Sequence, residues 1–268
     1  MVDQTTAQEH FHAGRLTDAI DAALAEVKKN PTDLDCRGLL AELLCFAGQW
    51  ERADKQIDAI GHQDPEAIVG LSMIRQLIRA EVSRQECVAQ GRPPELLAEP
   101  TPCIHKSLEA LAALRSGDAA QAVELLEQAE AARPAVSGIC DDKRFDDFRD
   151  LDDVVAGVVE VLTSTGKYYW IPTERIQTIE FHPPKRPRDL LWRQAEMTVE
   201  DGPYGDVFLP AVYSAPADDQ DDQLRLGRGT DFLGGDGSPT RCVGQRMFLV
   251  GDDAVSIMEI VNIDFTAE

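Results

Sequence analysis

The sequence predicts an α+β protein, with antiparallel helical repeats first and a smaller β-rich antiparallel domain after them. Between residues 6 and 133 the apolar residues recur every three or four positions, as on one face of a packed helix. From Gly166 onward they alternate with polar residues, which is typical of half-buried strands. This change of period predicts a helical repeat domain (1–134), an acidic connector with a helix (135–165) and a β-rich domain (166–268).

A glycine, a small residue and a proline recur together three times in the helical half. The first two copies lie 34 residues apart, the period of tetratricopeptide (TPR) repeats, and a long helix displaces the third. The glycines allow a turn between antiparallel helices, the alanines permit close helix approach, and the prolines end the second helix. The residues expected to pack the TPR-like repeats are Gly14, Ala19, Pro31, Gly48, Ala53, Pro65, Gly117, Ala122 and Pro134.

Further helices and strands follow from the same periodicities. We expect helices over 6–13, Leu16–Lys29, 66–90 and Leu151–Thr163, one after an Asp33 N-cap, one opened by Trp50, and a pair within 103–133. The expected strands are Tyr168–Ile171, Arg175–Phe181, Leu191–Thr198, Val207–Tyr213, Gln245–Val250 and Val255–Asp264. Residues 214–244 are rich in Asp, Gly and Pro and resemble a surface excursion.

The acidic balance of the chain restricts its partners. Its 26 basic and 48 acidic residues give a formal charge of −22, which disfavours nucleic acid because phosphate binding needs clustered Lys and Arg. The charge serves solubility or attracts a basic partner. The six cysteines form no Cys-x-x-Cys pair, which favours reduced thiols and a cytoplasmic location. Because the N-terminus is polar, we expect no signal peptide. Because no run of 18 apolar residues occurs, we expect no membrane span.

A search for catalytic and ligand-binding motifs finds none. The sequence lacks glycine-rich nucleotide-binding patterns, His-Glu-x-x-His and Gly-x-Ser-x-Gly, and its five histidines have no zinc spacing. The acidic segment 141–153 holds seven Asp in 13 residues but does not follow the ligand order of an EF-hand. We therefore predict a protein without enzymatic activity, cofactor or bound metal.

One aromatic block stands out in a chain that is only 6% aromatic. It joins GKYYWIPTERI (166–176) to RDLLWR (188–193), and its members with binding potential are Tyr168, Tyr169, Trp170, Arg175 and Trp192. One interpretation is a strand buried on both faces, which burial statistics favour. The other is an aromatic anchor on a protein-binding surface, where Trp, Tyr and Arg concentrate.

Four segments in order resemble the ImpE/TagJ family, accessory proteins of bacterial type VI secretion systems. They are LLAELLCFAGQWERADKQIDAI (39–60), GKYYWIPTERI (166–176), RDLLWRQAEMTV (188–199) and GQRMFLV (244–250). The resemblance implies a non-enzymatic cytoplasmic adaptor that binds the N-terminal helical segment of the small contractile-sheath subunit. It also implies an indirect link, through the sheath, to the AAA+ ATPase that disassembles it. The alternative is a general TPR scaffold or chaperone unrelated to secretion.

Overall fold

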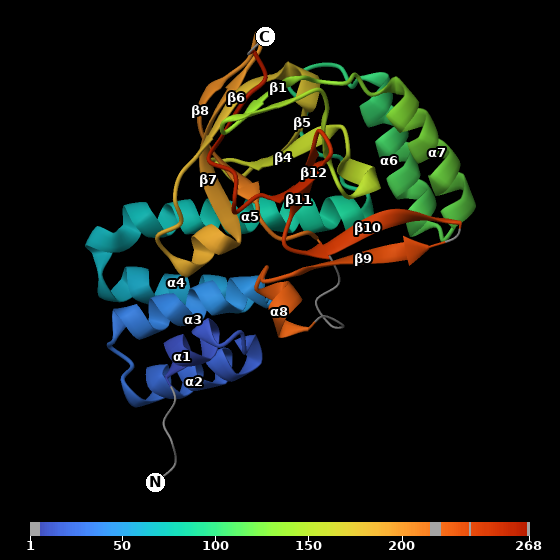
Figure 1. Ribbon diagram of the computed structural model, residues 1–268. Coiled ribbons are helices and arrows are strands. Elements are labelled where there is room, and N and C mark those ends of the chain that lie inside the picture. Colours follow the sequence, from blue (N-terminus) through green and yellow to red (C-terminus); the bar gives the residue numbers. More distant parts are fainter. Residues whose placement is uncertain (1–5, 215–220, 236, 267–268) are drawn as a thin grey trace.

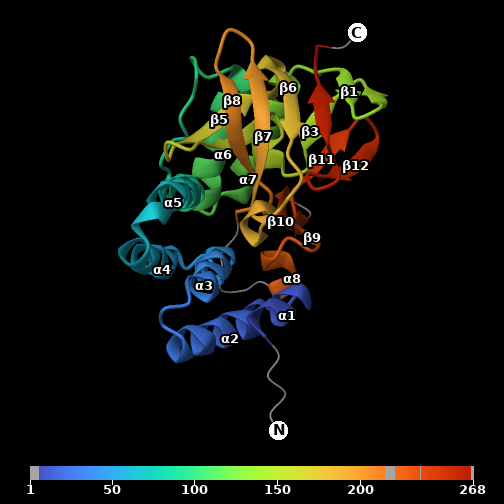
Figure 2. The ribbon, with the colours of Figure 1, turned by 90° about the vertical axis from the view of Figure 1, so that its left-hand side faces the viewer.

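In the computed structural model of this chain, a layer of helices packs against an antiparallel β-sheet (Figure 1). The structure describes residues 6–214, 221–235 and 237–266. Figure 2 shows α5 end-on between the other N-terminal helices and the sheet. The helical elements are α1 (Ala7–His12), α2 (Leu16–Lys29), α3 (Leu34–Phe46), α4 (Trp50–Gln63), α5 (Ile68–Gln90), α6 (Pro102–Arg115), α7 (Ala119–Ala132) and α8 (Asp222–Arg225), with 3₁₀ turns η1 (Pro65–Ala67), η2 (Asp153–Val155), η3 (Thr173–Arg175) and η4 (Pro187–Leu190).

Local signals explain where these helices begin and end. The Asp33 carboxylate accepts the Cys36 N–H at the start of α3, the N-cap expected from the sequence. Gly14, Gly48 and Gly117 lie between the paired helices with φ of 75°, 67° and 81°, a left-handed conformation that glycine adopts without strain. Ala19, Ala53 and Ala122 are completely buried. The three repeat prolines, Pro31, Pro65 and Pro134, each lie just beyond the end of a helix.

The three helical hairpins do not form one continuous stack. Hairpins α1–α2 and α3–α4 pack in sequence, and α5 packs on α4. The third hairpin, α6–α7, lies at the other end of α5 and packs against η2 and β10 (Figure 1). The long α5 therefore separates the third repeat from the first two and carries the chain beneath the sheet.

Within the part of the chain that the structure describes, the strands form one large sheet and two small ones, all antiparallel. The large sheet has the order β2-β1-β13-β6-β7-β8-β4-β5, and the small sheets are β12-β11-β3 and β10-β9. The strands are β1 (Gly138–Cys140), β2 (Lys143–Phe145), β3 (Phe148–Asp150), β4 (Val158–Leu162), β5 (Tyr168–Pro172), β6 (Ile176–Phe181), β7 (Trp192–Val199), β8 (Tyr204–Pro210), β9 (Thr230–Gly235), β10 (Ser238–Gly244), β11 (Met247–Val250), β12 (Asp253–Ser256) and β13 (Asn262–Asp264). The connector after α5 covers the β5 edge, because Glu95 N–H donates to the Tyr168 carbonyl at 2.9 Å.

The fold class is confirmed, whereas several element predictions are wrong. Leu151–Thr163 is not a helix but the turn η2 followed by the fully buried strand β4. The strand expected over Val255–Asp264 is divided between β12 and β13, and that over Val207–Tyr213 begins and ends earlier, as β8. The expected excursion over 214–244 contains α8 and the β9–β10 hairpin, while residues 215–220 and 236 of it lie outside the described residues.

Two hydrophobic cores lie on opposite faces of the large sheet. Strand β4 divides its side chains between them: Val158 and Leu162 join the core shared with the helices, while Val159 and Val161 join the core on the other face. The first core runs without a break from the helical hairpins to the sheet. None of the helices in the described residues is both long and apolar enough to cross a membrane.

Candidate functional site

The predicted aromatic block lies at the junction of helices and sheet. Trp170 and Trp192 are each 1% exposed and Tyr168 is 2% exposed, and all three lie in the core shared with the helices. Tyr169 points to the other face and is partly exposed, as is Arg175 in η3. In this conformation a partner can reach Tyr169 and Arg175, so partner binding through those two residues stays a prediction.

The polar edge of the Trp192 indole connects the two layers, whereas that of Trp170 hydrogen-bonds within the sheet. The Trp192 Nε1–H donates to the Glu81 carboxylate on α5 at 3.1 Å, and its ring stacks on Trp50 of α4 with centroids 6.3 Å apart. The Trp170 Nε1–H donates to the Tyr168 hydroxyl, which in turn donates to Glu160 on β4. The aromatic block therefore attaches α4 and α5 to the sheet.

The hydroxyl of Tyr168 leads into a buried ionic network formed by Glu81, Arg84, Asp150, Glu160 and Arg246. Glu160 accepts from Arg84 Nε at 2.9 Å and pairs with Arg246, which reaches Asp150 at 2.6 Å. Arg84 also binds Glu81 at 3.0 Å and donates to the Val212 carbonyl at 3.1 Å. These hydrogen bonds satisfy charges that would otherwise be costly to bury.

The two central carboxylates have opposite pKa shifts. Burial disfavours ionisation of Glu160, but Arg84 and Arg246 together outweigh burial and hold its pKa below the usual value. Burial raises the pKa of Asp150 to about 6, because Arg246 compensates only part of the desolvation. All five charged side chains are at most 5% exposed, so a substrate cannot reach them in this conformation. The network is suited to holding α5 against the sheet.

Sequence reasoning missed this network, although one signal was present. Glu160 interrupts the otherwise apolar run VVEVL, and a charge inside a fully buried strand requires a buried partner. The sequence could not identify the partners, because Arg84 and Arg246 are 76 and 86 positions away along the chain.

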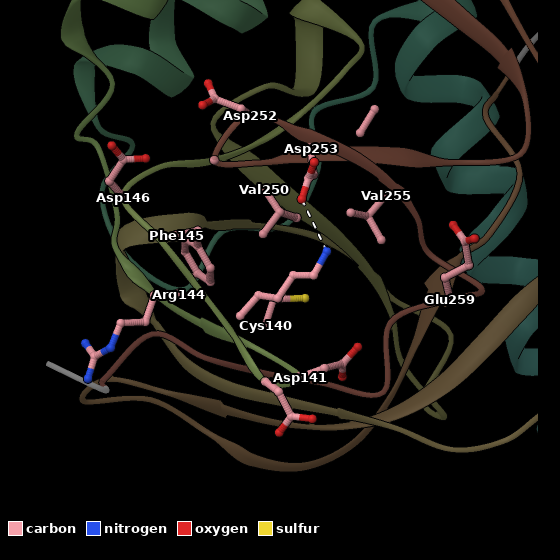
Figure 3. Close-up of a pocket in the computed structure, with 14 residues that line it drawn as sticks. Cys140, Asp141, Arg144, Phe145, Asp146, Val250, Asp252, Asp253, Val255 and Glu259 are labelled. Atoms are coloured by element: carbon pink, nitrogen blue, oxygen red, sulfur yellow. Dashed lines mark hydrogen bonds and ion pairs between the residues drawn. The ribbon is translucent and has the colours of Figure 1, made fainter.

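A broad hollow of the described surface lies beside two hairpins, β1–β2 and β11–β12 (Figure 3). Its volume is about 1090 Å³, and it is lined by more acidic than basic side chains. Lys143 and Asp253 pair across it at 3.4 Å, and Asp141 accepts the N–H groups of Val261 and Asn262. No group of three or more His, Cys, Asp or Glu within the described residues has the geometry to hold a metal. The hollow thus favours cationic groups by charge alone.

Fold and site together define a helical-repeat protein joined to an antiparallel sheet by a buried ionic network. The ImpE protein family model matches residues 142–264. The chain is 34% identical over 259 residues to the type VI secretion system accessory component TagJ of Pseudomonas aeruginosa, covering 97% of this chain and 90% of that protein. It also matches the crystal structure of protein VPA1032 from Vibrio parahaemolyticus, with a TM-score of 0.92, 27% identity and 98% of both chains covered. This chain belongs to the ImpE/TagJ family.

Proposed function

We propose that this chain is a non-enzymatic cytoplasmic adaptor of a type VI secretion system, which binds the N-terminal helical segment of the small contractile-sheath subunit. The observation that carries the proposal is the 34% identity, over nearly the whole chain, to a relative named as an accessory component of that system. The enclosed ionic network supports a non-enzymatic role, because its carboxylates and guanidinium groups bind each other.

The helical layer supports a helix as the ligand. Helical hairpins that stack side by side present grooves in which an amphipathic helix can place apolar residues at positions i, i+3, i+4 and i+7. Through the sheath subunit the adaptor would take part in assembly of the sheath, or in its disassembly by the associated AAA+ ATPase.

The test is a pull-down of the small sheath subunit with this protein as bait. The intact subunit should be retained, and the subunit lacking its N-terminal helical segment should not. The matched control is a subunit of full length in which the apolar residues of that segment are replaced by Ser, which should also be lost. Equal retention of all three would contradict the proposal and favour a general scaffold or chaperone.

A further inference from the structure

The N-terminal end of α5 extends past the sheet, together with α4 (Figure 1). Farther along α5, Leu77, Ala80 and Arg84 are buried beneath the sheet. In its first turn, however, Ile68 is 54% exposed and Val69 is 83% exposed. Exposed apolar surface that continues into an apolar groove is typical of an interaction site.

A groove lies between this protruding end of α5 and α4, which we call the α4–α5 groove. Its volume is about 380 Å³, and it is lined by Ile57, Asp58, Gly61, His62, Ile68, Leu71, Ser72 and Arg75. The buried Ile57 contributes to its apolar lining, and Gly61 keeps it open because it has no side chain. A Cβ at Gly61 would lie 3.6 Å from Leu71 Cδ1, an ordinary contact, so only a longer side chain would fill the groove.

The repeat architecture explains why the groove is left open. In stacked helical repeats each hairpin buries its apolar face under the next one. Here α5 packs on α4 as the next helix of the stack. The chain then leaves the far end of α5, so the next hairpin, α6–α7, lies at the opposite end of α5 from the groove. The face of α4 and α5 near Ile68 therefore lacks the helix that a continuing stack would supply.

Charges around the groove are mainly acidic. Arg75 is held by Asp54 and Asp58, each at 2.8 Å, so its charge is already neutralised. Asp64 and Glu66, at the turn between α4 and α5, add two more carboxylates. We call these four carboxylates the acidic rim of the groove. In a chain of formal charge −22, the acidic rim favours a basic occupant and repels an acidic one.

We propose that the α4–α5 groove binds an amphipathic helix whose apolar stripe is flanked by Lys and Arg. The helix adds itself to the repeat stack, covering Ile68 and Val69 while its basic side chains meet the acidic rim. The inference rests on the proposed function for the identity of the helix, which is the N-terminal segment of the small sheath subunit.

The experiment measures the affinity of two fluorescent peptides by anisotropy. One is the N-terminal segment of the small sheath subunit, and the other is an 18-residue Leu–Lys model helix. Ile68→Lys and Val69→Lys should each weaken both by tenfold or more, because they remove apolar contact and add charge of the same sign as the ligand. Tyr204→Lys is the matched control, because Tyr204 is 67% exposed on the separate β7–β8 hairpin and the net charge changes equally. It should leave the affinity within about twofold.

A second pair of variants tests the groove by filling it. Gly61→Gln should weaken both peptides, whereas Gly61→Ala, which leaves the groove open, should not. If both peptides bind the wild type and every variant equally, the groove proposal is overturned and the adaptor function stands. If only the model helix binds, and Ile68→Lys weakens that binding, the groove is a helix-binding site but the sheath subunit is not its ligand. If the wild type binds neither peptide, both are overturned.

Discussion

Asp150 is the residue of the ionic network whose ionisation is least favourable. It accepts from the Tyr213 hydroxyl at 2.7 Å and from Arg246 at 2.6 Å, yet burial still raises its pKa to about 6 from a usual 3.8. A carboxyl whose pKa is higher in the folded state stabilises the fold when protonated, and this contribution is lost as pH rises through the folded pKa.

We therefore expect Asp150→Asn to change how stability depends on pH. Between pH 4 and pH 7 the wild type should lose stability relative to Asp150→Asn, by on the order of 3 kcal/mol for a shift of about two pKa units. Urea unfolding of both proteins at each pH measures the difference. The exposed Asp253→Asn serves as the control and should run parallel to the wild type. A constant difference between wild type and Asp150→Asn would show that Asp150 has an ordinary pKa.

At the scale of elements, α8 and the loop after it hold the first helical hairpin. The Asp222 carboxylate accepts the Thr17 N–H at 3.0 Å near the start of α2, and Gln223 donates to the Gly14 carbonyl at 3.0 Å. Arg228 donates to the carbonyls of His12 and Phe11 and lies over the Phe11 ring. These side chains satisfy backbone groups that a helix end leaves without partners.

Arg228→Ala should loosen α1 without unfolding the sheet. Three interactions with the end of α1 are lost, while the sheet keeps its own hydrogen bonds. Hydrogen exchange should accelerate severalfold in α1 and in the first turn of α2, and stay unchanged in β7 and β8. The control is Arg92→Ala, since Arg92 pairs with Glu86 in an exposed position away from α1. Equal acceleration in all elements would show that Arg228 acts on global stability instead.

The helices could be predicted from the sequence more closely than the strands. Helix α2 has the expected bounds, and α4 begins at Trp50, because a period of 3.6 and the glycine turns at Gly14 and Gly48 set both. The sequence predicts a helix at strand β4 because Leu151, Val154, Val155, Val158 and Leu162 also fit a helical spacing. A strand buried on both faces shows no alternation, and only its Val content argues for a strand.

The candidate site is predictable only in part, because its residues come together through contacts between distant parts of the chain. The aromatic block was found as a local run, but its burial depends on Glu81 and Trp50, which come from helices more than 80 residues earlier. The α4–α5 groove has no local signal, since it exists because α6 leaves the stack.

At the scale of the whole molecule, the helical and β-rich parts share one core. Trp192 of the sheet stacks on Trp50 and binds Glu81, and Arg84 of α5 binds Glu160 of the sheet. Residues of both parts belong to the same buried cluster. A division into separately folding domains at residue 134 or 166 remains a prediction, and this shared core argues for a single cooperative unit.

Trp192→Ala tests that cooperativity. Truncating a fully buried Trp should cost about 3–5 kcal/mol, and the loss should appear in both parts of the chain because the side chain lies between them. Helix content followed by circular dichroism and sheet packing followed by fluorescence of Trp170, in a Trp50→Phe background that removes the helical fluorophore, should be lost at one lowered urea midpoint. Ala53→Leu, which overpacks the helical layer alone, should lower the free energy of unfolding by about 1–3 kcal/mol and shift the same shared midpoint. Two separate transitions, with the helical one unmoved by Trp192→Ala, would show that the helices fold without the sheet.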